Sequence, residues 1–237
     1  MSVVSEAVSE FFSRSEALLG AEAMKRLADV HVLVVGVGGV GSWCAEALVR
    51  TGVGHVTLMD DDAVAPSNVN RQCPATSRTV GRPKVEAMAE RLREINPACE
   101  IEARSVRYPS EHSDDRSLGR FSVVIDAIDS VPCKAELILD AFAARVPVIS
   151  SMGAALRTDP TRVRISRFAK VEGDGLARAL RQRFKRIGRF PGDFTCVWSA
   201  EPPREEGAAD GVRGSLMTVT ATFGMCLAKE AIACLTA

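Results

Sequence analysis

Residues 31–41 read His-Val-Leu-Val-Val-Gly-Val-Gly-Gly-Val-Gly. The first part of this run is rich in valine, which is typical of a short strand buried on both faces, and it leads into a glycine-rich loop. Residues 40–50 then have the composition of a helix, and residues 55–60 form a second apolar run after the turn signal Gly52-Val53-Gly54. Strand, glycine loop, helix and strand thus follow one another, and the right-handed crossover of such a unit predicts a parallel sheet.

The same alternation continues along the chain. Helical spacing covers residues 83–96 and 134–145, and apolar runs that suit strands occupy residues 101–106, 121–126 and 146–150. The sequence therefore predicts an α/β fold of Rossmann-like type, in which a mostly parallel sheet carries helices on both faces.

The last third of the chain shows a different pattern. Residues 161–168 alternate polar and apolar side chains with a period of two, as in an antiparallel strand with one face in water, and residues 193–199 form a second such candidate. Residues 201–214 are rich in proline, glycine and charge, which predicts a mobile loop before a terminal helix. We therefore expect C-terminal antiparallel strands and a terminal helix to extend the parallel core. A helix between the two strands has one apolar face, formed by Leu176, Leu180, Phe184 and Ile187.

The composition is that of an ordinary globular protein. The 237 residues are 46% hydrophobic and 25% charged, which is enough for one sizeable domain and argues against two independent ones. Residues 1–12 lack a basic start followed by an apolar core, so we expect no secretion signal. The most apolar long stretch, residues 215–237, is interrupted by Lys229 and Glu230, and a buried helix is the interpretation we favour over membrane contact.

The cysteines indicate the compartment. There are seven of them, an odd number, and none forms a Cys-x-x-Cys pair. This pattern argues against a disulfide framework and against a thiolate zinc site, so it predicts the reducing cytoplasm.

The glycine loop predicts nucleotide binding. Gly36, Gly38 and Gly41, with Gly39 between them, match a pattern that combines a tight turn, close backbone approach to phosphate and close helix packing. Asp60, at the end of the second strand, is placed to accept hydrogen bonds from ribose hydroxyls. These features fit NAD as well as ATP.

Polar residues beyond the loop favour ATP. Arg71 offers a planar fork for phosphate oxygens, Lys84 a compact cation, and Asn68 and Gln72 neutral polar groups. Asp129 follows the strand at residues 121–126 and supplies a carboxylate suited to Mg²⁺. Hydride transfer needs no such set, whereas attack on an α-phosphate does, because charge grows on the departing pyrophosphate. Surface salt bridges are the alternative explanation.

These motifs resemble the ubiquitin-activating-enzyme superfamily of ThiF-type adenylating proteins, which includes the molybdopterin-synthase and thiamine sulfur-carrier adenylyltransferases. The resemblance covers about residues 14–151 and rests on Arg14, Gly36-x-Gly-Gly-x-Gly41, Asp60, Ser67-x-x-Asn70-Arg71-Gln72, Gly81-Arg82-Pro83-Lys84 and Asp126-Ala127-Ile128-Asp129-Ser130. Within the superfamily, the chain most resembles the tRNA threonylcarbamoyladenosine dehydratases. That narrower similarity reaches the C-terminus through residues 12–20, 159–161, 197–201 and 217–224.

The resemblance implies a domain organisation and a reaction. Residues 1–237 would form a single ThiF-type adenylating domain, with a nucleotide-binding core at 15–151 and a substrate-binding extension at 152–237. The reaction would be the ATP-dependent dehydration, by cyclisation, of threonylcarbamoyladenosine in the anticodon loop of tRNA, through an acyl adenylate.

The resemblance also implies residue roles. It assigns the ribose to Asp60, Mg²⁺ to Asp129, and to Arg14 a reach across a homodimer interface to the partner's nucleotide; a plain surface arginine is the alternative for Arg14. The phosphates would be held by Asn68, Arg71 and Lys84. The catalytic candidates are therefore Arg14, Arg71, Lys84 and Asp129.

One segment of the chain is strongly basic, although the net charge is zero. Residues 157–189 contain eleven lysine or arginine residues and three acidic ones. Such a segment suits the phosphates of a tRNA anticodon loop, and a solvated helix face is the alternative. The RNA-binding candidates are Arg178, Arg181, Lys185 and Arg189.

Other functions remain open from the sequence. An adenylyltransferase acting on a ubiquitin-like sulfur-carrier protein is the main enzyme rival, although the missing Cys-x-x-Cys pairs weaken it, and a sulfur-transfer protein is a further candidate partner. A nucleotide-binding scaffold without chemistry and a nicotinamide dehydrogenase are the others. Cys196 would serve as a thioester or persulfide carrier in a sulfur-transfer reaction, but a buried strand cysteine is the interpretation we favour.

Overall fold

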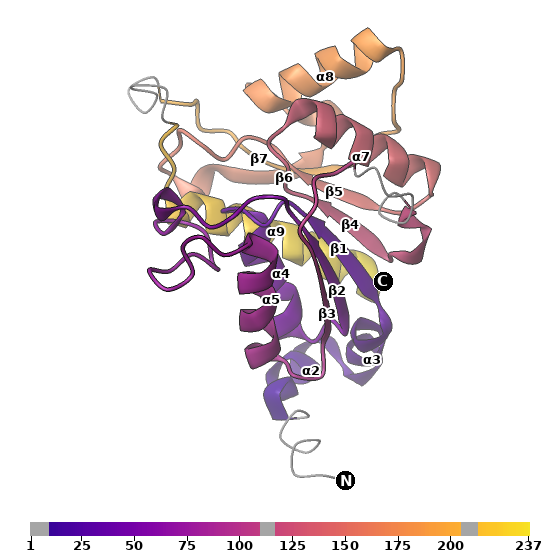
Figure 1. The fold of residues 1–237 in the computed structure, drawn as a ribbon. Helices are drawn as coiled ribbons and strands as arrows, with labels where there is room; N and C mark the ends of the chain where they lie inside the picture. The colour runs from indigo at the N-terminus through magenta and orange to yellow at the C-terminus, as the bar shows by residue number, and fades with distance from the viewer. Residues whose placement is uncertain (1–9, 110–116, 205–212) are drawn as a thin grey trace.

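A single seven-stranded sheet runs through the molecule in the order β3-β2-β1-β4-β5-β7-β6 (Figure 1). The structure is a computed structural model and describes residues 10–109, 117–204 and 213–237. All neighbouring strands pair in parallel except β6 and β7, which are antiparallel. The strands are β1 (His31–Val35), β2 (His55–Met59), β3 (Glu100–Arg104), β4 (Val123–Asp126), β5 (Val148–Ser151), β6 (Val163–Arg167) and β7 (Thr195–Ser199).

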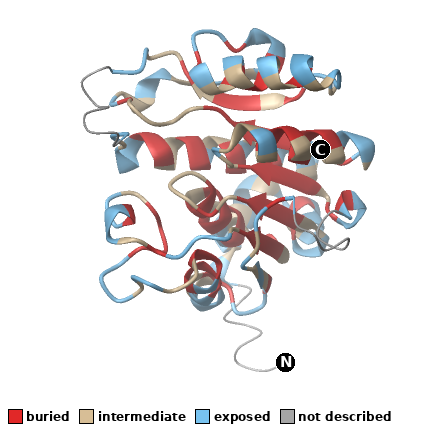
Figure 2. Ribbon diagram, turned by 45° about the horizontal axis from the view of Figure 1, so that its top comes forward, coloured by how far each residue is buried: buried red, intermediate tan, exposed pale blue. Residues whose placement is uncertain are grey.

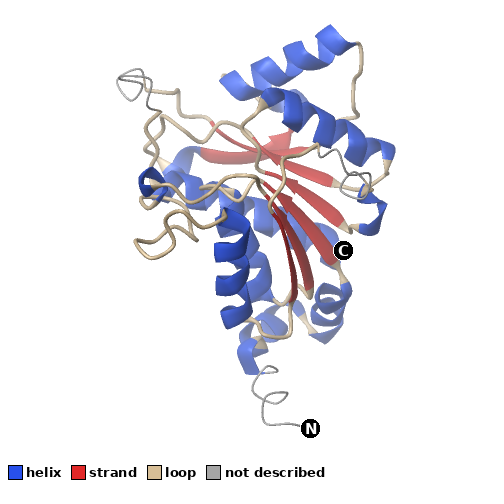
Figure 3. Cartoon of the chain, viewed as in Figure 1, coloured by secondary structure: helices blue, strands red, loops and turns tan. Residues whose placement is uncertain are grey.

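Helices cover both faces of this sheet (Figure 3). Helices α3, α4, α5 and α9 pack on the face that carries Val32 and Val34, whereas α7 and α8 pack on the face that carries Leu33 and Val35. The α-helices that the structure describes are α2 (Ser13–Leu19), α3 (Ala21–Asp29), α4 (Gly41–Thr51), α5 (Lys84–Ile95), α7 (Val131–Ala143), α8 (Gly175–Ile187) and α9 (Met217–Thr236). Short 3-10 turns are η1 (Pro66–Asn68), η2 (Leu118–Arg120), η3 (Pro160–Arg162) and η4 (Phe168–Lys170).

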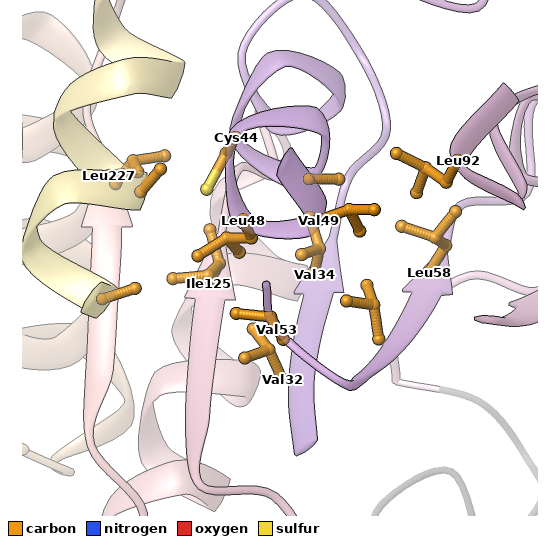
Figure 4. Close-up of a cluster of buried hydrophobic side chains, with 14 of the residues drawn as sticks. Val32, Val34, Cys44, Leu48, Val49, Val53, Leu58, Leu92, Ile125 and Leu227 are labelled. Atoms are coloured by element: carbon orange, nitrogen blue, oxygen red, sulfur yellow. The ribbon is translucent and has the colours of Figure 1, made fainter. Parts of the chain in front are cut away.

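The core explains why the central strands are nearly all apolar. Side chains of β1, β2 and β4 meet α4, α5 and α9 in one continuous cluster (Figure 4). Because adjacent residues of a strand point to opposite faces, a strand covered on both sides must be apolar throughout. Figure 2 shows the strands of the sheet largely buried, while the helices carry exposed residues on their outer sides.

The predicted α/β class and the C-terminal elaboration are confirmed. The segment at residues 193–199 is antiparallel to β6 but parallel to β5, so β6 alone runs against the rest of the sheet. Helices α2 and α3 were not predicted. Residues 205–212 of the loop predicted to be mobile lie outside the described part of the chain.

The terminal helix α9 is a core helix on one side. Among the described residues it is the helix long and apolar enough to cross a membrane by length and composition alone, and 39% of its most apolar window is buried. Val219, Phe223 and Leu227 are fully buried on that side. They pack against α4 and the sheet, as expected for the buried helix that the sequence predicts.

Helices α4 and α9 approach each other closely at a glycine. A Cβ atom on Gly224 would lie 2.6 Å from the carbonyl oxygen of Val40 and 2.8 Å from the Cβ of Trp43. Both neighbours belong to the start of α4, which also carries the glycine loop. The absence of a side chain at Gly224 therefore sets how close α9 comes to that loop.

We expect Gly224→Ala to destabilise the fold by about 1–3 kcal/mol. Alanine favours a helix over glycine by up to ~1 kcal/mol, but here the added methyl meets backbone that cannot move without shifting α4. Urea unfolding followed by circular dichroism measures the change. Gly119→Ala is the matched control, because a Cβ there meets nothing within 4 Å. Equal stabilities for the two variants would contradict the close approach.

Candidate functional site

A cleft of about 810 Å³ opens at the C-terminal ends of the parallel strands. It lies where β1 has β2 on one side and β4 on the other, the point of an open α/β sheet at which ligands usually bind. The structure brings most of the predicted nucleotide-binding residues together in its wall. They are Gly36, Gly38, Gly39, Asp60, Asn68, Arg71, Gln72, Lys84 and Asp129.

The glycine loop is shaped by close backbone contacts. Gly36 has a positive φ of 91°, and a Cβ there would lie 2.6 Å from the carbonyl oxygen of Ala127. A Cβ on Gly41 would overlap the carbonyl oxygen of Gly36, so Gly41 shapes the loop from behind although it does not line the cleft. Side chains at these positions would push the loop away from the end of β4.

Asp60 is fixed by the loop it faces. Its Oδ2 accepts a hydrogen bond from the backbone N–H of Val37 (2.7 Å), and its Oδ1 accepts one from that of Asp62 (2.9 Å). Burial raises the pKa of the Asp60 carboxyl above its usual value, while the charge of Lys84 opposes that rise. This carboxylate at the end of β2 can still accept hydrogen bonds from ribose hydroxyls through its remaining lone pairs.

The segment that carries Arg71 is tied to two helices. The indole N–H of Trp43 in α4 donates to the backbone oxygen of Arg71 (2.9 Å), and the amide of Asn70 donates to the backbone oxygen of Ser215 before α9 (2.9 Å). The Arg71 guanidinium donates to the backbone oxygen of Ser67 and to the Asn70 side chain, both at 2.9 Å. These bonds hold the arginine fork in the cleft while its other N–H groups stay available to a ligand.

Lys84 is almost buried in the cleft wall. Its Nζ lies 2.6 Å from Asp62 Oδ2 and 3.9 Å from Asp60 Oδ1, and its side chain is 7% exposed. The two carboxylates thus keep the Lys84 ammonium in the cleft wall. A bound anion could take the place of part of their contact with Lys84. Asp62 could not be identified from the sequence, because nothing in its spacing sets it apart from Asp60 and Asp61.

Two buried amides complete this part of the wall. Asn68 Oδ1 accepts from the backbone N–H of Ala65 (3.0 Å), so its NH₂ group is the donor that remains for a ligand. Gln72 Oε1 is buried and has no hydrogen-bond partner among the described residues. An orphaned buried acceptor costs about 1–3 kcal/mol, which is consistent with a site that a ligand completes.

Asp129 stands on a loop anchored by a buried ion pair. Asp129 itself is exposed and lines the cleft just before α7. Behind it, Lys134 Nζ contacts Asp126 Oδ2 at 2.7 Å, and both side chains are fully buried. Asp126 Oδ1 accepts from the backbone N–H of Ile128 (3.2 Å), and Ser150 donates to Oδ2 (2.6 Å). This network fixes the loop that carries Asp129. The role of Lys134 was not predicted from the sequence.

The cleft contains carboxylates that differ in how well they suit Mg²⁺. Among the described residues the one group of three adjacent carboxylates is Asp60, Asp61 and Asp62, which is partly neutralised by Lys84. Asp129 is a single exposed carboxylate that lines the same cleft as Arg71 and Lys84. Protein-bound Mg²⁺ commonly takes one or two carboxylates, several waters and substrate phosphates, so Asp129 fits such a role.

The far wall of the cleft comes from the C-terminal extension, and none of the residues that form it was predicted as a site residue. Arg157 is 4% exposed, and its Nη2 donates to Asp174 Oδ2 at 3.2 Å. Asp174 caps α8 by accepting from the backbone N–H of Ala177 (2.9 Å) and also accepts from that of Gly153 (3.2 Å). The first turn of α8 is thereby fixed against the loop after β5, and Arg213 adds a cation to the same wall.

The four RNA-binding candidates lie on α8 and just beyond its end, but they differ in environment. Arg178 and Lys185 are exposed, and Arg189 is exposed with its Nη1 3.6 Å from Glu136 of α7. Arg181 is half-buried, because its Nη2 donates to the backbone oxygens of Phe168 (2.7 Å) and Val171 (2.8 Å). It therefore holds η4 in place, a task that the helical pattern did not reveal.

Two other candidates lie outside the cleft. Arg14 is exposed on α2 and does not line the cleft of its own chain. Cys196 is fully buried in β7, and burial raises the pKa of its thiol above the usual value. A protonated and inaccessible thiol cannot act as a carrier, so the interpretation as a buried strand cysteine is confirmed.

The chain is similar to known proteins over nearly its whole length. The model of the ThiF family matches residues 12–237. The tRNA threonylcarbamoyladenosine dehydratase of Escherichia coli is 38% identical over 97% of this chain and 95% of its own length, and that of Bacillus subtilis is 42% identical over 81% and 75%. The molybdopterin-synthase adenylyltransferase of Salmonella typhimurium is 38% identical over 58% of this chain.

Solved structures are also similar to this chain over nearly its whole length. The E. coli dehydratase in complex with ATP superposes with a TM-score of 0.87 at 39% identity, over 99% of this chain and 97% of that one. The same enzyme with AMP gives 0.91 at 38% identity, over 99% and 98%. E. coli MccB with ATP, at 16% identity and a TM-score of 0.61, shares the fold.

Proposed function

The chain belongs to the ThiF family, and on this basis we propose that it catalyses the ATP-dependent dehydration of threonylcarbamoyladenosine in tRNA. The observation that carries the proposal is the cleft, where an arginine, a lysine, two amides and two carboxylates gather around a glycine loop. Relatives named for this activity align with 97% and 99% of this chain, so the alignment extends through the C-terminal third that supplies the far wall.

The nucleotide-binding wall receives ATP in this proposal. Backbone N–H groups of the glycine loop at the start of α4 face the phosphates, because a helix N-terminus favours anions. Asp60 accepts hydrogen bonds from the ribose, while Arg71 and Lys84 bind the phosphates together with the Asn68 amide. Gln72, which also lines the cleft, contributes a polar contact through its side-chain amide. Mg²⁺ bound at Asp129 would neutralise charge on the phosphates.

The chemistry proceeds in two steps. The threonyl carboxylate of the modified adenosine attacks the α-phosphorus of ATP, forms a carboxyl–phosphate bond and releases pyrophosphate. A nucleophile of the carbamoyl group then attacks the activated carbonyl, closes a ring, loses its proton and expels AMP. The oxygen atom removed from the substrate leaves in AMP. The chain contributes by positioning and by stabilising the developing charge, because no covalent enzyme intermediate is needed.

We propose one adenylating domain over residues 1–237, with a nucleotide-binding core at 15–151 and a substrate-binding extension at 152–237. Continuity of the sheet through β5, β7 and β6 supports this division. So does the cleft, to which both parts contribute. All seven cysteines are free, which fits the reducing cytoplasm that we propose as its location.

A homodimer would bring Arg14 to the active site of the partner. Helix α2 has no buried residues, and the large apolar side chains of Leu18 and Phe11 are 84% and 55% exposed. Such exposure favours burial against a second copy. Arg14 lies on this helix, away from the cleft of its own chain.

Mixing two inactive variants tests the proposed reach of Arg14. Arg14→Ala and Arg71→Ala are each expected to be inactive as homodimers. When subunits are exchanged, the Arg14→Ala subunit keeps its own Arg71 and receives Arg14 from its partner, so activity should return in part. No recovery would mean that Arg14 acts within its own subunit, and full activity of Arg14→Ala alone would mean that it has no role.

The rival function is activation of a ubiquitin-like sulfur-carrier protein. ATP–pyrophosphate exchange distinguishes the two, since exchange reports the reversible formation of an acyl adenylate, and this adenylate forms only when the correct carboxylate is present. We expect threonylcarbamoyl-modified tRNA to stimulate exchange and a protein ending in Gly-Gly not to do so. Stimulation by the protein alone would replace the proposal, and it would favour a sulfur-transfer partner.

A further inference from the structure

A second, smaller pocket of about 230 Å³ lies between the C-terminal half of α8 and residues 190–193. Its inner walls are Phe168 and Phe184, which are nearly buried and meet edge to face with ring centroids 6.4 Å apart. Phe194 stacks on the back of Phe168 at 4.7 Å. At the rim, Phe190 is 70% exposed. The pocket is therefore a preformed aromatic recess with a solvent-exposed aromatic ring beside it.

Polar groups at this rim are held in fixed positions. The Arg181 guanidinium lies over the Phe168 ring at 4.7 Å from its centroid, and two backbone oxygens accept from its Nη2. Asp193 accepts from the backbone N–H of Ala169 (3.1 Å) and from Arg167 Nε (3.2 Å). Because Phe194 and the Arg181 guanidinium cover the Phe168 ring, a flat ligand with hydrogen-bonding edges would find the exposed Phe190 ring, a guanidinium plane and a carboxylate.

The surface beside the pocket is cationic. Arg178 and Lys185 stand three residues before and four residues after Arg181, so all three lie on the same side of α8. Arg178 and Lys185 are exposed, as is Arg189 beyond the end of the helix. The carboxylate of Asp193 is balanced by Arg167. Aromatic faces combined with excess positive charge favour a polyanion that carries flat groups, which describes single-stranded nucleic acid.

The pocket and the cleft are joined by α8. Gly175, Leu176 and Ala179 of the helix line the cleft, whereas Arg181 and Phe184 line the aromatic pocket. With a rise of 1.5 Å per residue, the two sites are separated by roughly 10 Å along the helix. Because about 3.6 residues make one turn, the residues that line the cleft and those that line the pocket lie on different sides of α8. One RNA strand would therefore have to pass around the helix to place one nucleotide in the cleft and a nearby base in the pocket.

We propose that this pocket binds an unpaired base of the tRNA anticodon loop close to the modified adenosine, with Phe190 stacking on that base. The inference rests on the proposed function, because it takes tRNA as the substrate. It explains why a large apolar side chain stays exposed at a cationic surface. Phe190 is a binding residue in this account and takes no part in ATP binding.

Three substitutions of Phe190 separate stacking from simple packing. Phe190→Ala should weaken binding of a threonylcarbamoyl-modified anticodon stem-loop RNA by roughly 5- to 150-fold, the range expected for loss of one base–aromatic stack. Phe190→Leu keeps apolar area without an aromatic face and should weaken RNA binding to a similar extent. Phe190→Trp keeps an aromatic face and should retain the affinity of the wild type. ATP affinity and the melting temperature should stay unchanged. Equal RNA affinity for Ala, Leu and wild type would overturn the proposal.

The base itself can be identified with abasic RNA. Stem-loops that each lack one loop base are compared with the intact stem-loop. At one position, loss of the base should weaken binding to the wild-type protein. The same loss should not weaken binding to Phe190→Ala, which has already lost the stacking partner. If loss of the base and Phe190→Ala have additive effects on affinity at every loop position, the proposed base pocket is wrong. A change in oligomeric state on substitution of Phe190 would also overturn the proposal, since the pocket would then belong to a contact between copies. Failure of the proposed function can be distinguished from failure of the base pocket. If the wild-type protein neither binds nor converts modified tRNA, the proposed function is wrong, and this is seen before any variant is made.

Discussion

Arg71→Ala is expected to lower tRNA-dependent ATP–pyrophosphate exchange by about 10²- to 10³-fold. Loss of one preorganised contact to a developing charge costs roughly 3–4 kcal/mol in enzyme sites. Arg71 meets this description, because Ser67 and Asn70 hold its guanidinium in the cleft before any ligand binds. Exchange rates measured at saturating ATP and modified tRNA report the effect.

Arg71→Lys provides the matched control. It keeps the charge but lacks the planar fork, so activity should fall between that of the wild type and that of Arg71→Ala. The backbone oxygen, and not the side chain, of Arg71 accepts from Trp43, so the loop should stay in place in both variants. Exchange by Arg71→Ala within a few-fold of the wild type would remove Arg71 from the catalytic set.

Lys134→Met should destabilise the protein by about 3–5 kcal/mol. Removing one partner of a buried ion pair leaves the other charge uncompensated, and both side chains here are fully buried. The substitution also removes hydrogen bonds to Ser150 (3.3 Å) and to the backbone oxygen of Ser151 (3.0 Å). Urea unfolding at neutral pH gives the free energy of unfolding for comparison with the wild type.

A double variant tests the cause of this loss. Asp126→Asn removes the second charge while keeping an oxygen that can accept from Ile128, so Lys134→Met with Asp126→Asn should be more stable than Lys134→Met alone. If the double variant is no more stable than the single one, buried charge is not the reason. A loss of less than ~1 kcal/mol for Lys134→Met would mean that the pair is unimportant for folding.

The central fold could be predicted because its physical cause is local. Strands covered on both faces are largely apolar, and β1, β2 and β4 each appear as such a run beside a glycine or a turn. Helix α2 was missed because none of its residues is buried, which leaves no apolar face to detect. The direction of β7 depends on its pairing with β5, a contact between distant segments.

For the candidate site, too, residues close together in the sequence could be predicted, whereas contacts between distant segments could not. Asp60, Arg71 and Lys84 follow strands or turns within one continuous part of the sequence, so their spacing alone indicates a shared cleft. The pairing of Arg157 with Asp174 was missed because it is created only when the loop after β5 meets α8. Helical periodicity predicts on which side of α8 Arg181 lies. It cannot predict that a backbone oxygen of a distant segment accepts a hydrogen bond from Arg181.

Mass spectrometry of the modified nucleoside tests the central claim most directly. The protein is incubated with ATP, Mg²⁺ and tRNA that carries threonylcarbamoyladenosine, and the tRNA is then digested to nucleosides. The account predicts a nucleoside lighter by one water molecule and one AMP formed for each, with neither product when ATP is omitted. An unchanged nucleoside mass in the presence of intact ATP would contradict it.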